Sequence, residues 1–95
     1  MRIRKRSLVM LGRGGHLRGA YCEGTHQLMV GIDKFGSLYQ AARNIGMAYS
    51  KAWKMMQEVQ QKNGDLIIAH GARGSEITPK GRGYMETYER ERMNE

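Results

Sequence analysis

The chain has 95 residues, a net charge of +7, a pI of about 9.9 and one cysteine. A chain of this length forms one domain with a modest core, so residues 1–95 are expected to be a single domain with no room for a second, ligand-sensing one. One cysteine excludes an intrachain disulfide and a cysteine-based metal cluster, and no apolar run approaches the roughly 18 residues of a membrane helix, so we expect a cytoplasmic protein with no membrane partner.

The N-terminal segment combines a strongly basic composition with a weak strand pattern. Residues 3–11 alternate and then run apolar, and the glycines of residues 12–15 indicate a turn before a partner strand near Leu17. We predict a short hairpin here, with a disordered basic arm as the competing interpretation. Six basic side chains and no acidic one occupy residues 1–18: Arg2, Arg4, Lys5, Arg6, Arg13 and Arg18.

The next segment has the apolar spacing of a helix. From Glu23 onward the apolar residues recur every three or four positions, and Gly36 follows as a C-terminal glycine would. The predicted apolar face consists of Leu28, Met29, Ile32 and Phe35.

Residues 38–57 have the pattern of a helix-turn-helix. The small Ala42 suits the closest approach of two helices that cross at about 90–120°, and Gly46 suits a left-handed corner. Ala52 and Met55 fall on the face of the second helix that returns to the core. We predict helices over 38–45, capped by Ser37, and over 49–63, ended by glycine. A helical hairpin packed in a small bundle is the alternative.

The C-terminal third predicts a strand, a glycine-rich loop, a strand and a helix. We predict a short buried strand over residues 66–69, a loop tip over residues 71–74 and the return strand over residues 76–78. Thr78 and Pro79 then open a last helix through Tyr84, Met85 and Tyr88. The whole order predicts a mainly α fold with small β-hairpins: a winged helix-turn-helix with a three-helix core, a C-terminal helix, a wing and N-terminal strands.

In this fold the N-terminal residues of the second helix of the motif meet base edges in the major groove. Lysine can donate to guanine and glutamine can pair with adenine. The Tyr49 ring either touches a base or packs inward and offers its hydroxyl to a phosphate, whereas Trp53 favours packing. The residues predicted to read bases are Ala48, Tyr49, Ser50, Lys51, Lys54 and Gln57.

A second group is predicted to contact phosphates, and such contacts position a protein on DNA without specifying sequence. Arg73 lies between glycines at the wing tip, which suits a minor groove or a phosphate. Lys80 and Arg82 begin the last helix, and Arg43 lies on the first helix of the motif.

The charge distribution agrees with this arrangement. Residues 37–82 carry seven basic and three acidic side chains, whereas the last thirteen residues carry four acidic and two basic ones. A polyanion is expected to meet the motif, the wing and the N-terminal arm, while the last helix faces elsewhere. A merely solvated basic surface is the alternative.

Enzyme chemistry is not predicted, and neither is a cofactor or a metal. His16, His26 and His70 lack the spacing of metal ligands and are expected to be surface or hydrogen-bonded residues. The glycines of residues 12–15 lack the lysine and hydroxyl residue of a phosphate-binding loop.

The chain resembles the N-terminal DNA-binding domain of the ModE family, the molybdate-responsive transcription regulators, and more distantly the LysR-type winged helices. The resemblance rests on Gly36-Ser37-Leu38, Ala41-Ala42, Gly46-Met47-Ala48-Tyr49, Ala52-Trp53 and Ile77-Thr78-Pro79 with Gly81. It covers most of the chain and implies a winged helix-turn-helix that regulates transcription as a dimer.

The chain also departs from the family pattern. Family regulators continue into molybdate-binding domains, and this chain ends after the last helix, so direct molybdate sensing is not expected. Ala48 replaces the usual serine, and the wing, residues 70–75, is short, so base readout and wing contacts are expected to differ.

We therefore expect a sequence-specific regulator that binds duplex DNA as a homodimer. Two other classes remain open: a winged helix that partners a separate effector-sensing protein, and an architectural DNA binder with little sequence preference. An exposed basic face formed by Lys51, Lys54 and Arg73 favours DNA over a protein partner.

Overall fold

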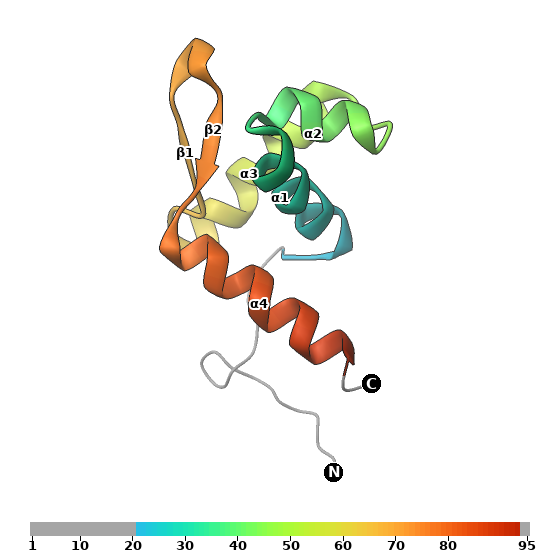
Figure 1. Ribbon diagram of the computed structural model, residues 1–95, viewed down its shortest axis with the longest axis vertical. Helices are drawn as coiled ribbons and strands as arrows, with labels where there is room; N and C mark the ends of the chain where they lie inside the picture. The colour runs from blue at the N-terminus through green and yellow to red at the C-terminus, as the bar shows by residue number, and fades with distance from the viewer. Residues whose placement is uncertain (1–20, 94–95) are drawn as a thin grey trace.

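The computed structural model describes residues 21–93. These residues form four helices and a two-stranded antiparallel sheet (Figure 1), which confirms the expected mainly helical fold with a small hairpin. The predicted N-terminal hairpin and its six basic residues lie outside the described residues. In chain order the elements are α1 (Glu23–Phe35), α2 (Leu38–Asn44), α3 (Tyr49–Asn63), β1 (Ile67–Ala69), the 3-10 turn η2 (Gly71–Arg73), β2 (Ser75–Ile77) and α4 (Pro79–Met93).

The helix ends follow local capping chemistry. Gly36 ends α1 in the left-handed region (φ 80°), and the Ser37 hydroxyl accepts a hydrogen bond from the Gln40 amide at 3.0 Å. Gly46 has φ 71° in the turn between α2 and α3, as predicted. Helix α2 ends at Asn44, one residue before the predicted end, because Ile45 already takes the non-helical conformation of the cap.

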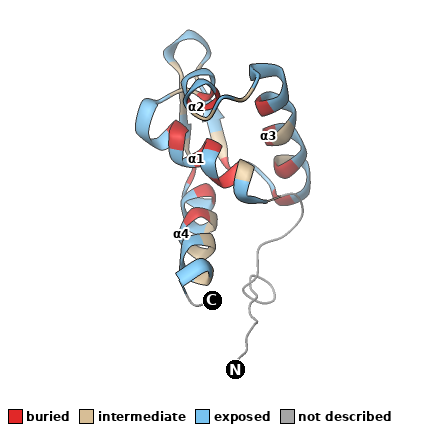
Figure 2. Cartoon of the chain, turned by 90° about the vertical axis from the view of Figure 1, so that its right-hand side faces the viewer, coloured by how far each residue is buried: buried red, intermediate tan, exposed pale blue. Residues whose placement is uncertain are grey.

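The core lies where α1, α2 and α3 meet, and most residues that the apolar patterns predicted are buried there (Figure 2). Met55 is only partly buried, and Met56, one residue later, takes the core position instead. The buried hydrophobic residues are Leu28, Met29, Ile32, Leu38, Ala41, Ala42, Ala52, Met56, Val59, Leu66 and Met85.

Helices α1 and α2 approach closely at Gly31 and Ala41. A Cβ atom added at Gly31 would lie 2.5 Å from the Cβ of Ala41, which is too close for two non-bonded carbon atoms. Ala42 is buried as predicted. The sequence predicted a close approach at Ala42, between the two helices of the motif. It did not predict the contact of Gly31 with Ala41, because these two residues lie on different helices.

One residue predicted for the apolar face of α1 is exposed. Phe35 is 41% exposed, and the ammonium of Lys34 lies 5.5 Å from the centre of its ring. The helical stripe ends at Ile32 because α1 itself ends at Phe35 and the chain turns away at the following glycine.

The β1–β2 hairpin pairs Ile67 with Ile77, Ile68 with Glu76 and Ala69 with Ser75. The predicted strand 66–69 was wrong in its start and its burial: Leu66 is buried but precedes β1, whereas Ile68 and Ala69 are exposed. A two-stranded sheet extending from a small body has no second layer to bury its outer residues. The return strand β2 spans Ser75–Ile77 and not the predicted residues 76–78, because Thr78 caps α4.

Two sets of hydrogen bonds hold the hairpin, one near its tip and one at its base. The Ser75 amide donates to the Gly36 carbonyl at 2.8 Å, which fixes β2 to the corner between α1 and α2. The side-chain oxygen of Gln60 on α3 accepts from the amides of Leu66 and Ile67 at 2.7 and 2.9 Å. The hairpin therefore has fixed contacts with both α3 and the α1–α2 corner.

Helix α4 begins at a buried cap and packs against α1. The hydroxyl of Thr78 accepts from the Gly81 amide and donates to the Asp65 carbonyl, both at 2.9 Å. Met85 is buried, and Tyr84 packs against the core. No helix between residues 21 and 93 combines the length and the apolar composition that a membrane span requires.

Candidate nucleic-acid interface

The N-terminal half of α3 presents the predicted base-reading residues on one exposed surface. Ala52, Met56 and Val59 turn toward the core, so the opposite side of the helix faces solvent (Figure 2). Helical spacing places Ser50, Lys54 and Gln57 near the centre of that solvent-facing side. All six predicted residues are exposed: Ala48, Tyr49, Ser50, Lys51, Lys54 and Gln57.

The lysines of this surface are exposed and free to meet a ligand. Within residues 21–93, neither Lys51 nor Lys54 forms an ion pair with another side chain. Glu58 lies one turn after Lys54 on the same side of α3, so an acidic side chain follows the lysines there. Positive charge is therefore concentrated in the first turns of α3.

The start of α3 has little side-chain capping of its own. Ala48 is the N-cap and has no side-chain acceptor, although its carbonyl accepts the first helical hydrogen bond from Ala52 at 3.0 Å. The first amides of a helix favour an anion such as a phosphate oxygen when no side chain caps them.

Trp53 is 51% exposed, which corrects the preference for packing that its size suggested. It lies one turn after Tyr49, which is 48% exposed. Both rings are exposed because smaller residues fill the core positions between α1 and α3. The sequence allows the Tyr49 ring either to touch a base or to pack inward, and the exposed ring does not pack inward.

Sequence reasoning missed Tyr39, which lies beside this surface. Tyr39 on α2 is 51% exposed, and the centre of its ring is 6.1 Å from that of Tyr49. The Arg43 guanidinium lies 5.8 Å from the Tyr39 ring centre and donates to its hydroxyl at 3.4 Å. The four-residue spacing of Tyr39 and Arg43 was the signal available in the sequence.

The tip of the hairpin holds the predicted arginine in the open. Arg73 is the last residue of the turn η2 and is exposed, and within the described residues its side chain forms no ion pair. Below the tip, Nε2 of His70 lies 2.6 Å from a carboxylate oxygen of Glu76, so the acidic group of the hairpin already has a partner.

Lys80 and Arg82 are exposed but bind other parts of the chain. The Lys80 ammonium donates to the Asn63 carbonyl at the end of α3, at 2.8 Å. Arg82 donates to both carboxylate oxygens of Asp33 at 2.8 and 3.0 Å, and these hydrogen bonds lower the pKa of Asp33. These two cations join α4 to α3 and α1, unlike the lysines of α3.

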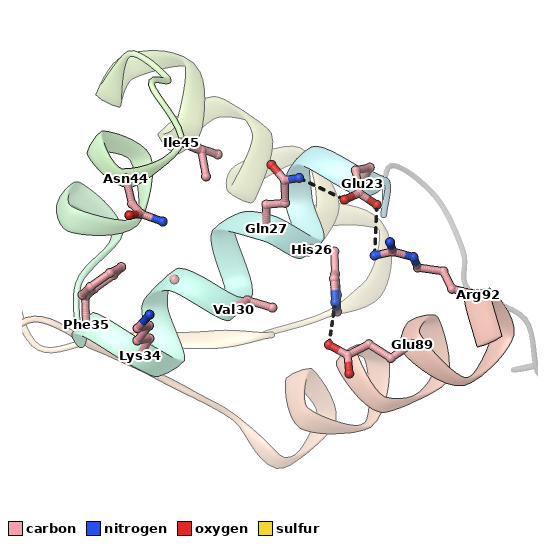
Figure 3. A pocket seen from close by; sticks show the side chains of 11 residues that line it. Glu23, His26, Gln27, Val30, Lys34, Phe35, Asn44, Ile45, Glu89 and Arg92 are labelled. Carbon is pink, nitrogen blue, oxygen red and sulfur yellow. Dashed lines mark hydrogen bonds and ion pairs between the residues drawn. The ribbon is translucent and has the colours of Figure 1, made fainter.

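A groove of about 300 Å³ runs beside α1, between the end of α2 and α4 (Figure 3). Several of its polar side chains pair with one another: Gln27 donates to Glu23 at 2.9 Å, and Arg92 lies 3.5 Å from the same carboxylate. The imidazole of His26 is 3.0 Å from Glu89 on α4. These contacts join α1 to α4.

His26 is only 3% exposed and is hydrogen-bonded, as the sequence predicted for such histidines. The Tyr21 hydroxyl lies 2.9 Å from its Nδ1, and the Tyr88 ring centre lies 4.4 Å from that of the imidazole. Burial and the neighbouring Tyr88 and Glu89 raise the pKa of Tyr21 well above its usual range. Burial and a hydrogen bond to Glu23 raise the pKa of Tyr88 to about 12.

Across residues 21–93, no three histidine, cysteine or carboxylate side chains are grouped to hold a metal ion. Neither a protein-family model nor a curated protein matches the chain significantly.

Proposed function

We propose that this chain is a DNA-binding transcriptional regulator with a winged helix-turn-helix fold. In this proposal α2 and α3 form the helix-turn-helix, α3 is the recognition helix, and the β1–β2 hairpin is the wing. The observation that carries the proposal is the exposed start of α3, where Ser50, Lys51 and Lys54 follow a tight glycine turn. Such a helix start is the part that enters the major groove in helix-turn-helix proteins.

The resemblance to the ModE family supports the same proposal, because its G-M-x-Y-x-x-A-W run begins in the turn and continues into α3. We further propose that the protein is cytoplasmic and acts as a homodimer. A twofold dimer places two recognition helices about 34–36 Å apart, which corresponds to an inverted repeat with half-sites about one turn apart.

The test is selection of fragmented genomic DNA by the purified protein at two salt concentrations, followed by sequencing. A sharp inverted repeat that persists at the higher salt supports a sequence-specific regulator. Enrichment without a motif that vanishes with salt supports the architectural alternative, because phosphate contacts alone lose affinity steeply with salt.

Variants then separate reading from positioning. Lys54→Ala and Ser50→Ala are expected to change the selected sequence, whereas Arg73→Ala weakens all sites alike. Arg90→Ala on α4 is the control, since it removes one exposed positive charge from an element outside the motif and the hairpin. Uniform loss of affinity for Ser50, Lys54 and Arg73 variants contradicts the assignment of α3.

A protein-interaction role is the second candidate, and the half-exposed Tyr39, Tyr49 and Trp53 are the observation that favours it. Tyrosine and tryptophan are enriched in protein interfaces. The partner in this case is a separate effector-sensing protein. No enrichment of DNA at either salt concentration favours this candidate over DNA binding.

A further inference from the structure

Tyr39, Arg43 and Tyr49 form an exposed cluster that joins the outer side of α2 to the start of α3. The two aromatic rings are 6.1 Å apart at an interplanar angle of 56°. The Arg43 guanidinium lies against the Tyr39 ring, 5.8 Å from its centre, and donates through Nη1 to the Tyr39 hydroxyl at 3.4 Å. We call these three residues the Tyr-Arg-Tyr cluster.

Core packing does not account for this cluster. The two tyrosines are 51% and 48% exposed, and Arg43 is exposed as well. A cation over an aromatic ring contributes little to stability at an exposed site. The contacts with Tyr39 instead restrict the long, flexible side chain of Arg43 to one position beside α3.

The free groups of the cluster are hydrogen-bond donors. A guanidinium has five N–H donors, and Arg43 uses one of them on Tyr39. The remaining donors of Arg43 and the Tyr49 hydroxyl are suited to the oxygens of a phosphodiester, for which arginine has the matching planar geometry. No carboxylate belongs to the cluster to compete for the arginine.

We infer that the Tyr-Arg-Tyr cluster binds one backbone phosphate of the DNA strand next to the bases that α3 meets, with Tyr39 positioning the Arg43 guanidinium. This inference rests on the proposed DNA-binding function. It adds Tyr39 to the interface and assigns it an action through Arg43, while Tyr49 contributes its hydroxyl to the same phosphate. The cluster fixes the register of α3 in the groove and does not itself select bases.

The experiment measures the dissociation constant of a short fluorescent DNA duplex by anisotropy over a series of salt concentrations. Arg43→Ala is expected to lower affinity about tenfold, the size of one charge-assisted hydrogen bond. It should also reduce the slope of log affinity against log salt by about 0.9, one phosphate contact. Arg43→Lys should retain the slope and lose affinity, because a lysine keeps the charge without the planar donors.

Tyr39 is tested by a double-mutant cycle. Tyr39→Ala is expected to lower affinity in the wild-type background and to have no further effect when Arg43 is already alanine. Tyr39→Phe keeps the ring and loses the hydroxyl, so it should retain part of the affinity. An independent loss for Tyr39→Ala in the Arg43→Ala background contradicts positioning and makes Tyr39 a direct contact.

Controls separate this inference from the proposed function. Each variant is compared with the wild type by circular dichroism and thermal unfolding, and Arg90→Ala provides a loss of one charge on α4. If the wild type binds no duplex, the proposed function fails. If the wild type binds and Lys54→Ala weakens it while Arg43→Ala leaves the affinity and the salt slope unchanged, the cluster is wrong and the function stands.

Discussion

Gly31 is the residue at which α1 and α2 have no space for a side chain. A Cβ there would meet the Cβ of Ala41 at 2.5 Å and its Cα at 2.8 Å. Gly31→Ala is expected to destabilise the protein by about 1–3 kcal/mol, the usual cost of overpacking a filled core. Urea unfolding followed by circular dichroism measures the change.

Gly83 provides the matched control for the same substitution. It lies in α4, and a Cβ there would meet nothing within 4 Å. Gly83→Ala is expected to stabilise the protein by about 0.4–1 kcal/mol, because alanine restricts the unfolded chain and favours helix. A Gly31→Ala variant as stable as Gly83→Ala would contradict the close approach of α1 and α2.

Tyr88 gives the protein a dependence on alkaline pH. Its pKa is raised to about 12, whereas an unfolded tyrosine ionises near pH 10. Between these values the unfolded state has lost a proton that the folded state retains, so stability falls as the pH rises from about 10 to 12. Tyr21, whose pKa is raised as well, acts in the same direction.

The measurement is the urea midpoint across this pH range for wild type and Tyr88→Phe. The variant loses the hydrogen bond to Glu23, so we expect a lower midpoint at neutral pH and a shallower fall above pH 10. Absorbance titration of the phenolates in the folded protein should show late ionisation that Tyr88→Phe reduces. An unchanged slope of stability with pH would place the alkaline sensitivity elsewhere.

At the scale of single residues, the sequence predicted those whose role is local and missed those whose role depends on a residue of another helix. Ser37 and Gly46 have their predicted conformations because caps and corners involve adjacent residues. The exposure of Trp53 and the contact of Tyr39 with Tyr49 depend on how α2 crosses α3, which no local spacing specifies.

The start of α4 depends on one hydroxyl that serves two elements. Thr78 accepts from the Gly81 amide and donates to the Asp65 carbonyl, so it caps α4 and ties it to the segment before β1. Thr78→Ala is expected to cost about 0.5–2 kcal/mol, near the upper end because the residue is buried. Equilibrium unfolding in urea measures the loss.

Two substitutions bracket this expectation. Thr78→Ser keeps the hydroxyl and should recover most of the stability. Ser37→Ala removes a cap whose hydroxyl accepts a single hydrogen bond, from Gln40, and should cost less than Thr78→Ala. Equal losses for the two alanine variants would show that the bond to Asp65 contributes nothing.

The helices could be predicted closely, and the strands could not. The predicted range 49–63 is the observed range of α3, since a glycine follows it and its apolar residues repeat at helical spacing. Each strand has only three residues, and each is anchored by a residue outside the hairpin, β1 by Gln60 and β2 by Gly36. A strand pattern of three residues has no period from which burial can be inferred.

At the scale of the whole molecule, the proposed homodimer makes a geometric prediction. Sedimentation velocity over a range of concentrations is expected to show a dimer, and footprinting should show two protected half-sites separated by about one helical turn. A monomer that protects a single half-site would remove the twofold arrangement and leave the recognition helix in place.

The placement of charge could be predicted in part. The sequence placed basic residues along the motif and the hairpin, and the exposed cations of α3 and of the hairpin tip agree with this. It did not separate the lysines of α3 from Lys80 and Arg82, because the partners of those two cations, the Asn63 carbonyl and Asp33, are distant in sequence. Tertiary contacts decide which charges remain available.

Trp53 has a further consequence for how the molecule can be observed. It is the one tryptophan of the chain, and it is half exposed on α3. All of the protein's indole fluorescence therefore originates within one turn of Lys54 and reports solvent access at that place alone. Emission wavelength and acrylamide quenching can follow any partner that covers α3 without a label or a substitution.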